Sequence, residues 1–128
     1  MNQSDITQLE HIKKLVDSFY GKVREDDLLK DIFNGVIGDR WPIHLEKMYR
    51  FWQTVLLNEH TYQGAPFFPH IKLPIHQEHF ERWIKLFRET VDEHFAGENA
   101  AFAKAQAERM ALIFQHKLST IRGHAPKE

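Results

Sequence analysis

The sequence contains no cysteine among its 128 residues. This absence excludes disulfide bonds, thiolate zinc sites, iron–sulfur clusters and haem attached covalently through a Cys-x-x-Cys-His motif. The chain also lacks a run of about 18 apolar residues that could cross a bilayer, and its polar start has no signal-peptide core. We therefore expect a cytoplasmic protein without a membrane partner.

A strong charge of either sign is missing as well. Lys and Arg number 17 against 18 Asp and Glu, so the formal charge is −1 and the pI is near 6.8. This balance gives no electrostatic footprint for nucleic acid or for an anionic membrane surface. We therefore expect no nucleic-acid partner.

Several enzyme motifs are absent. The sequence has no Gly-rich phosphate loop, no Gly-x-Ser-x-Gly elbow, no Glu-x-x-His pair of the di-iron bundles and no His-Glu-x-x-His of the zinc hydrolases. These absences exclude the corresponding phosphoryl-transfer, hydrolytic and metal-enzyme classes.

No segment alternates apolar and polar residues as a strand would, and there is no internal repeat or interdomain linker. Apolar residues recur with helical spacing, so the predicted fold class is all-α. The length fits a single domain over residues 1–128, with flexible ends at about 1–6 and 123–128. Helices are expected after a capping-box pattern at residues 7–10, over 26–33 before a break at Asn34, Gly35 and Gly38, over 40–56, over 80–91, and for roughly 20 residues after a turn at 97–99.

His70 lies in a segment that the sequence makes stiff. Pro69 and Pro74 restrict the backbone on either side of it, and Phe67 and Phe68 make its surroundings apolar. An imidazole held in this way can serve as the axial ligand of a haem iron. A single histidine among apolar residues is more often a core residue, so the assignment depends on the other polar residues of the chain.

Three further polar side chains are expected on buried helix faces. Tyr20 belongs to an apolar stripe, His44 begins a buried face one turn before Met48, and Trp83 lies on an apolar stripe of its own. With His70 they offer one metal-binding imidazole and three hydrogen-bond donors, which suits an iron atom that carries a small anionic ligand. The alternative, for each taken alone, is an ordinary core residue that donates to a backbone carbonyl.

The remaining histidines give no second metal site. His76 and His79 are three residues apart near the opening of an exposed helix, and we expect them to form a solvated surface pair. We also expect surface positions for His60, His94, His116 and His124.

Seven short segments together carry a family resemblance: Phe19 and Tyr20, residues 32–34, 41–44, Phe51 and Trp52, 62–66, 67–74 and 79–83. The series is similar to the truncated haemoglobins, specifically to their group III, and it spans nearly the whole chain. Groups I and II carry Gly-Gly pairs near the helix junctions, and this sequence has none. Group III is therefore the predicted match.

The resemblance implies a truncated globin fold, a two-over-two helical sandwich around a non-covalent b-type haem. It implies that His70 is the proximal ligand of the iron. The haem pocket would further include Phe33, Met48, Trp52 and Trp83. The side chains that stabilise a ligand on the distal side would be Tyr20, His44 and Trp83.

The implied function is the binding of O₂, NO, CO or cyanide by a monomeric protein. A pocket with several donors favours tight holding of an anionic ligand, which suits redox chemistry or sensing better than rapid O₂ transport. One alternative is therefore an NO dioxygenase or peroxidase-like enzyme, which would require a reductase. The other alternative is a haem-free helical interaction module whose inward Tyr, His and Trp side chains are ordinary core residues.

Overall fold

A computed structural model describes residues 3–59 and 76–123 of the chain. No strand occurs in either of these ranges, so the all-α prediction is confirmed. None of the helices in the described ranges is long and apolar enough to span a membrane. The elements are α1 (Leu9–Glu25), α2 (Lys30–Ile37), the 3₁₀ turn η1 (Gly38–Arg40), α3 (Trp41–Leu57), α4 (Gln77–His94) and α5 (Glu98–Gly123).

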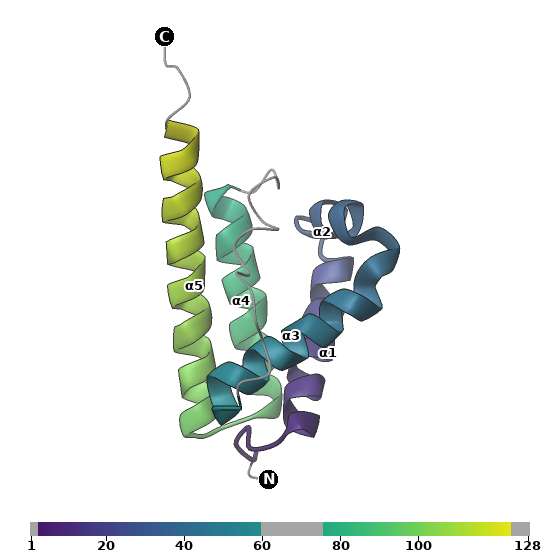
Figure 1. Cartoon of the computed structure of the whole chain (residues 1–128), viewed down its shortest axis with the longest axis vertical. Helices are drawn as coiled ribbons and strands as arrows, with labels where there is room; N and C mark the ends of the chain where they lie inside the picture. The colour runs from purple at the N-terminus through teal and green to yellow at the C-terminus, as the bar shows by residue number, and fades with distance from the viewer. Residues whose placement is uncertain (1–2, 60–75, 124–128) are drawn as a thin grey trace.

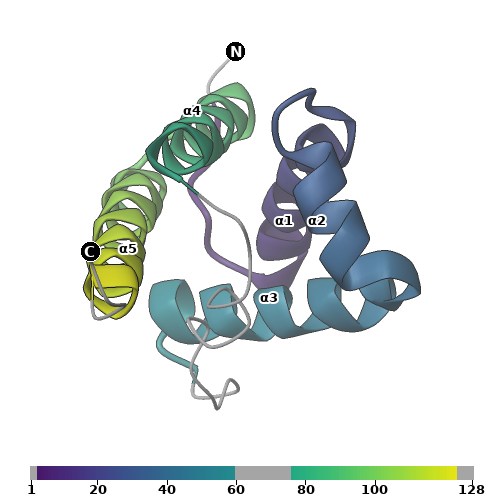
Figure 2. The same ribbon diagram turned by 90° about the horizontal axis from the view of Figure 1, so that it is seen from above.

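The four long helices form two pairs (Figure 1). Helix α5 runs back along α4, whereas α1 crosses α3 and also packs against α4 (Figure 2). The short α2 and η1 connect the end of α1 to the beginning of α3. This is the two-over-two arrangement that the family resemblance implied.

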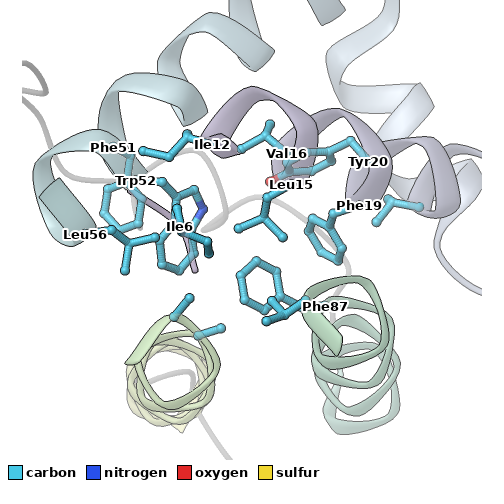
Figure 3. Close-up of a cluster of buried hydrophobic side chains, with 14 of the residues drawn as sticks. Ile6, Ile12, Leu15, Val16, Phe19, Tyr20, Phe51, Trp52, Leu56 and Phe87 are labelled. Atoms are coloured by element: carbon cyan, nitrogen blue, oxygen red, sulfur yellow. The ribbon is translucent and has the colours of Figure 1, made fainter. Parts of the chain in front are cut away.

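The apolar stripe of α1 fixes this helix in the core. Figure 3 shows its side chains pointing toward Phe87 of α4 and toward Trp52 and Leu56 of α3. Burying one such aliphatic or aromatic side chain is worth about 1.5–3 kcal/mol relative to leaving it exposed, so the stripe outweighs the weak helix propensity of its β-branched members. The predicted stripe is confirmed in full, since all of its members are buried: Ile12, Leu15, Val16, Phe19, Tyr20 and Val23.

The start of α1 differs from the prediction. The N-cap residue is Gln8, and its side chain makes no capping hydrogen bond. The backbone N–H of Thr7 donates instead to Nδ1 of His11, at 3.0 Å. The expected capping box is therefore wrong. The pattern assigned the N–H of Thr7 to the side chain of Glu10, but this N–H donates to the imidazole of His11 in the first turn of the helix.

Helix α2 also begins later and ends later than predicted. The carboxylate of Asp26 accepts hydrogen bonds from the N–H groups of Leu28 (3.0 Å) and Leu29 (3.1 Å), which holds a turn ahead of the helix. Asn34 lies inside the helix rather than ending it. The helix ends at Gly38, whose φ of 58° is favoured in glycine over residues with a side chain.

The segment before α1 is attached to the beginning of α5. The two carboxylate oxygens of Asp5 accept hydrogen bonds from the N–H groups of Asn99 (2.9 Å) and Ala100 (2.8 Å), so Asp5 caps a helix far away in the sequence. Ile6 is fully buried in the core. These residues belong to the stretch that we expected to be a flexible end, and they make packed and hydrogen-bonded contacts instead.

Candidate functional site

Tyr20 of α1 and His44 of α3 lie against each other because these two helices cross. Their ring centroids are 5.1 Å apart and the rings are nearly perpendicular, at 87°. Tyr20 is only 6% exposed, and the Nε2 atom of His44 is buried. Burial raises the pKa of the Tyr20 phenol well above its usual value, so the hydroxyl remains protonated and available as a donor at neutral pH.

Trp83, the third predicted donor, reaches the same aromatic cluster from α4. The ring of Phe19 lies edge-on between two partners, 4.8 Å from Tyr20 and 5.3 Å from Trp83. The indole of Trp83 also stacks on Phe87 at 5.8 Å and 11°. The structure thus brings the three predicted donors around one cluster, with Phe19 between Trp83 and Tyr20.

An apolar cavity lies beside Trp83, between α2, α4 and α5. Its empty volume is about 390 Å³, including the open space at its mouth. Phe33 and Trp83 line it, as predicted for the pocket, and the Phe33 ring lies 6.5 Å from that of Tyr20. Phe33 therefore connects the cavity to the Tyr20–His44 pair.

The sequence analysis missed most of the cavity wall. The additional lining residues are Leu29, Ile32, His79, Phe80, Ala111 and Phe114. Phe80 and Phe114 do belong to helical apolar stripes, but a stripe identifies the buried face of a helix and not the cavity that the face meets.

The expectation for His79 was wrong. This side chain is half-buried and lines the cavity, whereas His76 is exposed. The Nδ1 atom of His79 accepts a hydrogen bond of 2.9 Å from the backbone N–H of His76, which closes the first turn of α4. A neutral imidazole that accepts through Nδ1 carries its proton on Nε2.

Two residues that we assigned to the haem pocket lie in the main core. Trp52 is 4% exposed and stacks on Phe87 at 5.2 Å and 20°. Met48 is half-buried against the same core. Both are outside the set of described residues that line the cavity. Their contact with a cofactor remains a prediction.

His70 and the segment around it fall between the two described ranges, so the proximal assignment also remains a prediction. Within residues 3–59 and 76–123, no three His, Asp or Glu side chains come together in a group that could hold a metal ion.

A partly buried ion pair joins α4 to the turn between α1 and α2. Nη1 of Arg82 lies 2.7 Å from Oδ1 of Asp26, whose side chain is 10% exposed against 36% for Arg82. Burial acts to raise the pKa of the Asp26 carboxyl, but the hydrogen bonds from Arg82, Leu28 and Leu29 together lower it below its usual 3.8. The pair therefore holds the cavity-lining Leu29 beside α4.

We expect Asp26→Ala to lower the free energy of unfolding by about 1–2 kcal/mol at pH 7, since solvent around Arg82 screens part of the ion pair. The pKa of Asp26 is lower in the folded state, so its contribution is present above 3.8 and is lost as the pH falls through the folded value. Urea unfolding of the variant and the wild type at pH 7 and pH 3 measures this difference in the free energy of unfolding. Asp27→Ala, at a carboxylate that is 99% exposed, is the control. Equal losses from the two variants would contradict the role of Asp26.

The chain matches known proteins over nearly its whole length. The sequence model of the bacterial-like globin family matches residues 5–119. A group 3 truncated haemoglobin of Campylobacter jejuni subsp. jejuni is 40% identical over 119 residues, which cover 90% of this chain and 94% of that protein. The crystal structure of a group III truncated haemoglobin from Campylobacter jejuni has a TM-score of 0.83 and 38% identity, covering 92% of this chain and 95% of that one. This chain therefore belongs to the bacterial-like globins, as a truncated haemoglobin of group III.

Proposed function

We propose that this protein binds a b-type haem without a covalent bond, with His70 as the proximal ligand of the iron. Small ligands, namely O₂, NO, CO and cyanide, would bind on the opposite side, near Tyr20, His44 and Trp83. The observation that carries the proposal is the contact between the Tyr20 and His44 rings beside an apolar cavity lined by Phe33 and Trp83. Membership of the globin family supports it, since globins bind haem and diatomic gases.

The described residues fit a flat and largely apolar group. The cavity wall is built from aromatic and aliphatic side chains, among them Phe33, Phe80 and Phe114. Such walls suit a macrocycle whose faces and most of whose edges are apolar. Haem, when bound, would supply an iron atom that can bind a small ligand.

The part played by the protein is to donate hydrogen bonds to that ligand. Tyr20 offers a protonated phenol, and the indole N–H of Trp83 can only donate. A hydrogen bond to a charged acceptor is typically worth about 1.5–3 kcal/mol, which is more than a neutral acceptor gains. The site therefore favours ligands that are negatively charged when bound, such as cyanide and, through its partial charge, O₂, over neutral CO.

The absorption spectrum of the purified protein, loaded with haem, tests the proposal. We expect a Soret band in the ferric and ferrous forms and a clear shift of the ferrous band on addition of CO. A protein that is folded by circular dichroism but shows no Soret band after haem is added would support the haem-free interaction module instead.

An enzymatic role is the second candidate. Three donors from three helices converge on one aromatic cluster, and such an arrangement stabilises charge that develops during a reaction as well as charge on a bound ligand. The candidate activities are NO dioxygenation and peroxidase-like oxidation. Repeated turnover of NO in the presence of O₂ and an added reductase, and none without the reductase, would favour an enzyme over a simple carrier.

A further inference from the structure

Trp41, the first residue of α3, touches both members of the Tyr20–His44 pair. Its ring centroid lies 5.7 Å from that of Tyr20 and 5.6 Å from that of His44, and it meets the imidazole edge-on at 87°. Trp41 is 4% exposed. The three rings are in mutual contact, so a rotation of the indole would displace one or both of the polar side chains.

Two polar residues hold Trp41 from the outside. The indole Nε1–H donates a hydrogen bond of 3.1 Å to Oδ1 of Asn34, and the guanidinium of Arg24 lies 4.6 Å from the centre of the indole ring. The side-chain amide of Asn34 also donates to the backbone carbonyl of Arg24, at 3.4 Å. Asn34 thus joins the last turn of α1, the middle of α2 and the first residue of α3 at a single point.

We propose that Trp41, fixed by Asn34 and Arg24, is a positioning residue that sets the orientation of Tyr20 and His44 toward the ligand. This inference rests on the proposed function, because it assumes that these two side chains face a bound ligand. A hydrogen bond weakens steeply when its donor is misaligned, so a tilt of the donor is sufficient to reduce its effect. Asn34, although exposed on α2, would therefore influence the selectivity between O₂ and CO.

The test uses substitutions at Asn34, which leave all three rings intact. Asn34→Leu removes the acceptor of the indole hydrogen bond at similar volume. In the haem-loaded protein it is expected to raise the O₂ dissociation rate about three- to tenfold and to change CO dissociation by less than about twofold. Asn34→Asp keeps the acceptor oxygen for the indole N–H but loses the donor to the carbonyl of Arg24, so its O₂ dissociation rate should lie closer to the wild-type value than that of Asn34→Leu. Asp31→Asn, at an exposed position of the same helix, is the control and should leave both rates unchanged.

A double substitution shows whether Asn34 acts through the Tyr20 hydroxyl. In a Tyr20→Phe background, Asn34→Leu should have a much smaller effect on O₂ dissociation than it has alone, because the side chain that it misaligns no longer donates. Fully additive effects of the two substitutions would overturn the proposal.

A structural readout separates this inference from the proposed function. NMR of the CO-bound ferrous protein reports the contact between the Tyr20 and His44 rings and the protection of the Trp41 Nε1–H from solvent exchange. We expect Asn34→Leu to weaken both signals. If both stay at wild-type values, the positioning role is overturned whatever the gas kinetics show. If Tyr20→Phe alone changes the dissociation rates of O₂ and CO in parallel, the donor role of Tyr20 in the proposed function is wrong. The NMR signals then support or overturn the positioning role of Trp41 by themselves.

Discussion

His70→Gly is expected to abolish stable haem binding, or to make it depend on added imidazole. The glycine removes the ring that we assign as the proximal ligand and leaves a space that free imidazole can enter. Absorption spectra of the ferric, ferrous and CO-bound forms, recorded with and without imidazole, measure the effect. The loss should be close to complete, because the proposal assigns no other residue as a ligand of the iron.

Two other histidines serve as comparisons for this experiment. His44→Ala should retain haem, since its ring lies against Tyr20 and Trp41 on the proposed distal side. His79→Gln should also retain it. His79 lines the cavity, but its Nδ1 accepts a hydrogen bond from the N–H of His76. The ring proton is then on Nε2, so neither nitrogen has a free lone pair for iron. Wild-type ferrous and CO spectra in the His70 variant would show that the proximal assignment is wrong, and His44 would become the leading alternative.

Tyr20→Phe or Trp83→Phe is expected to raise the O₂ dissociation rate at least about tenfold while changing CO dissociation much less. Bound O₂ carries partial negative charge, and loss of a hydrogen bond to a charged acceptor costs about 1.5–3 kcal/mol, or roughly 10- to 150-fold in rate. Phenylalanine keeps most of the ring volume, so packing against Phe19 changes little in the Tyr20 variant. Stopped-flow measurement of dissociation for the two gases checks the prediction.

The two donors are linked through Phe19, so their effects need not add. The double substitution of Tyr20 and Trp83 should show a larger effect than either single one, and its departure from additivity measures their coupling. His44→Leu should act mainly on ligand entry if the imidazole is a gate, and on dissociation if it is a third donor. Parallel changes for O₂ and CO in these variants would mean that steric access controls the pocket, and the donor roles of Tyr20 and Trp83 would have to be withdrawn.

The sequence by itself determined the helical class and the buried face of α1. The stripe of α1 could be read correctly because the 3.6-residue period is a local property, and each buried side chain reports it independently. The same spacing identified Tyr20 and Trp83 as polar groups on apolar faces. The family resemblance added the two-over-two arrangement, which periodicity alone does not encode.

Contacts between elements were decided only by the tertiary structure. The start of α2 depends on Asp26, whose carboxylate holds a turn and also meets Arg82 of α4, an interaction that no local pattern reveals. Asn34 resembles a helix breaker in the sequence, yet in the fold its amide joins Arg24 to Trp41. Local propensities are worth fractions of a kcal/mol, so a buried partner from a distant helix readily overrides them.

The lining of the cavity also could not be predicted from local sequence patterns. His79 and Phe80 are adjacent in the sequence, and spacing near the start of a helix placed His79 at the surface, but both side chains line the cavity with Phe114 of α5. Helical periodicity specifies the direction in which a side chain points from its own axis. The group that it meets depends on the crossing of two helices and on the distance between them, and these are set by the packing of the whole core.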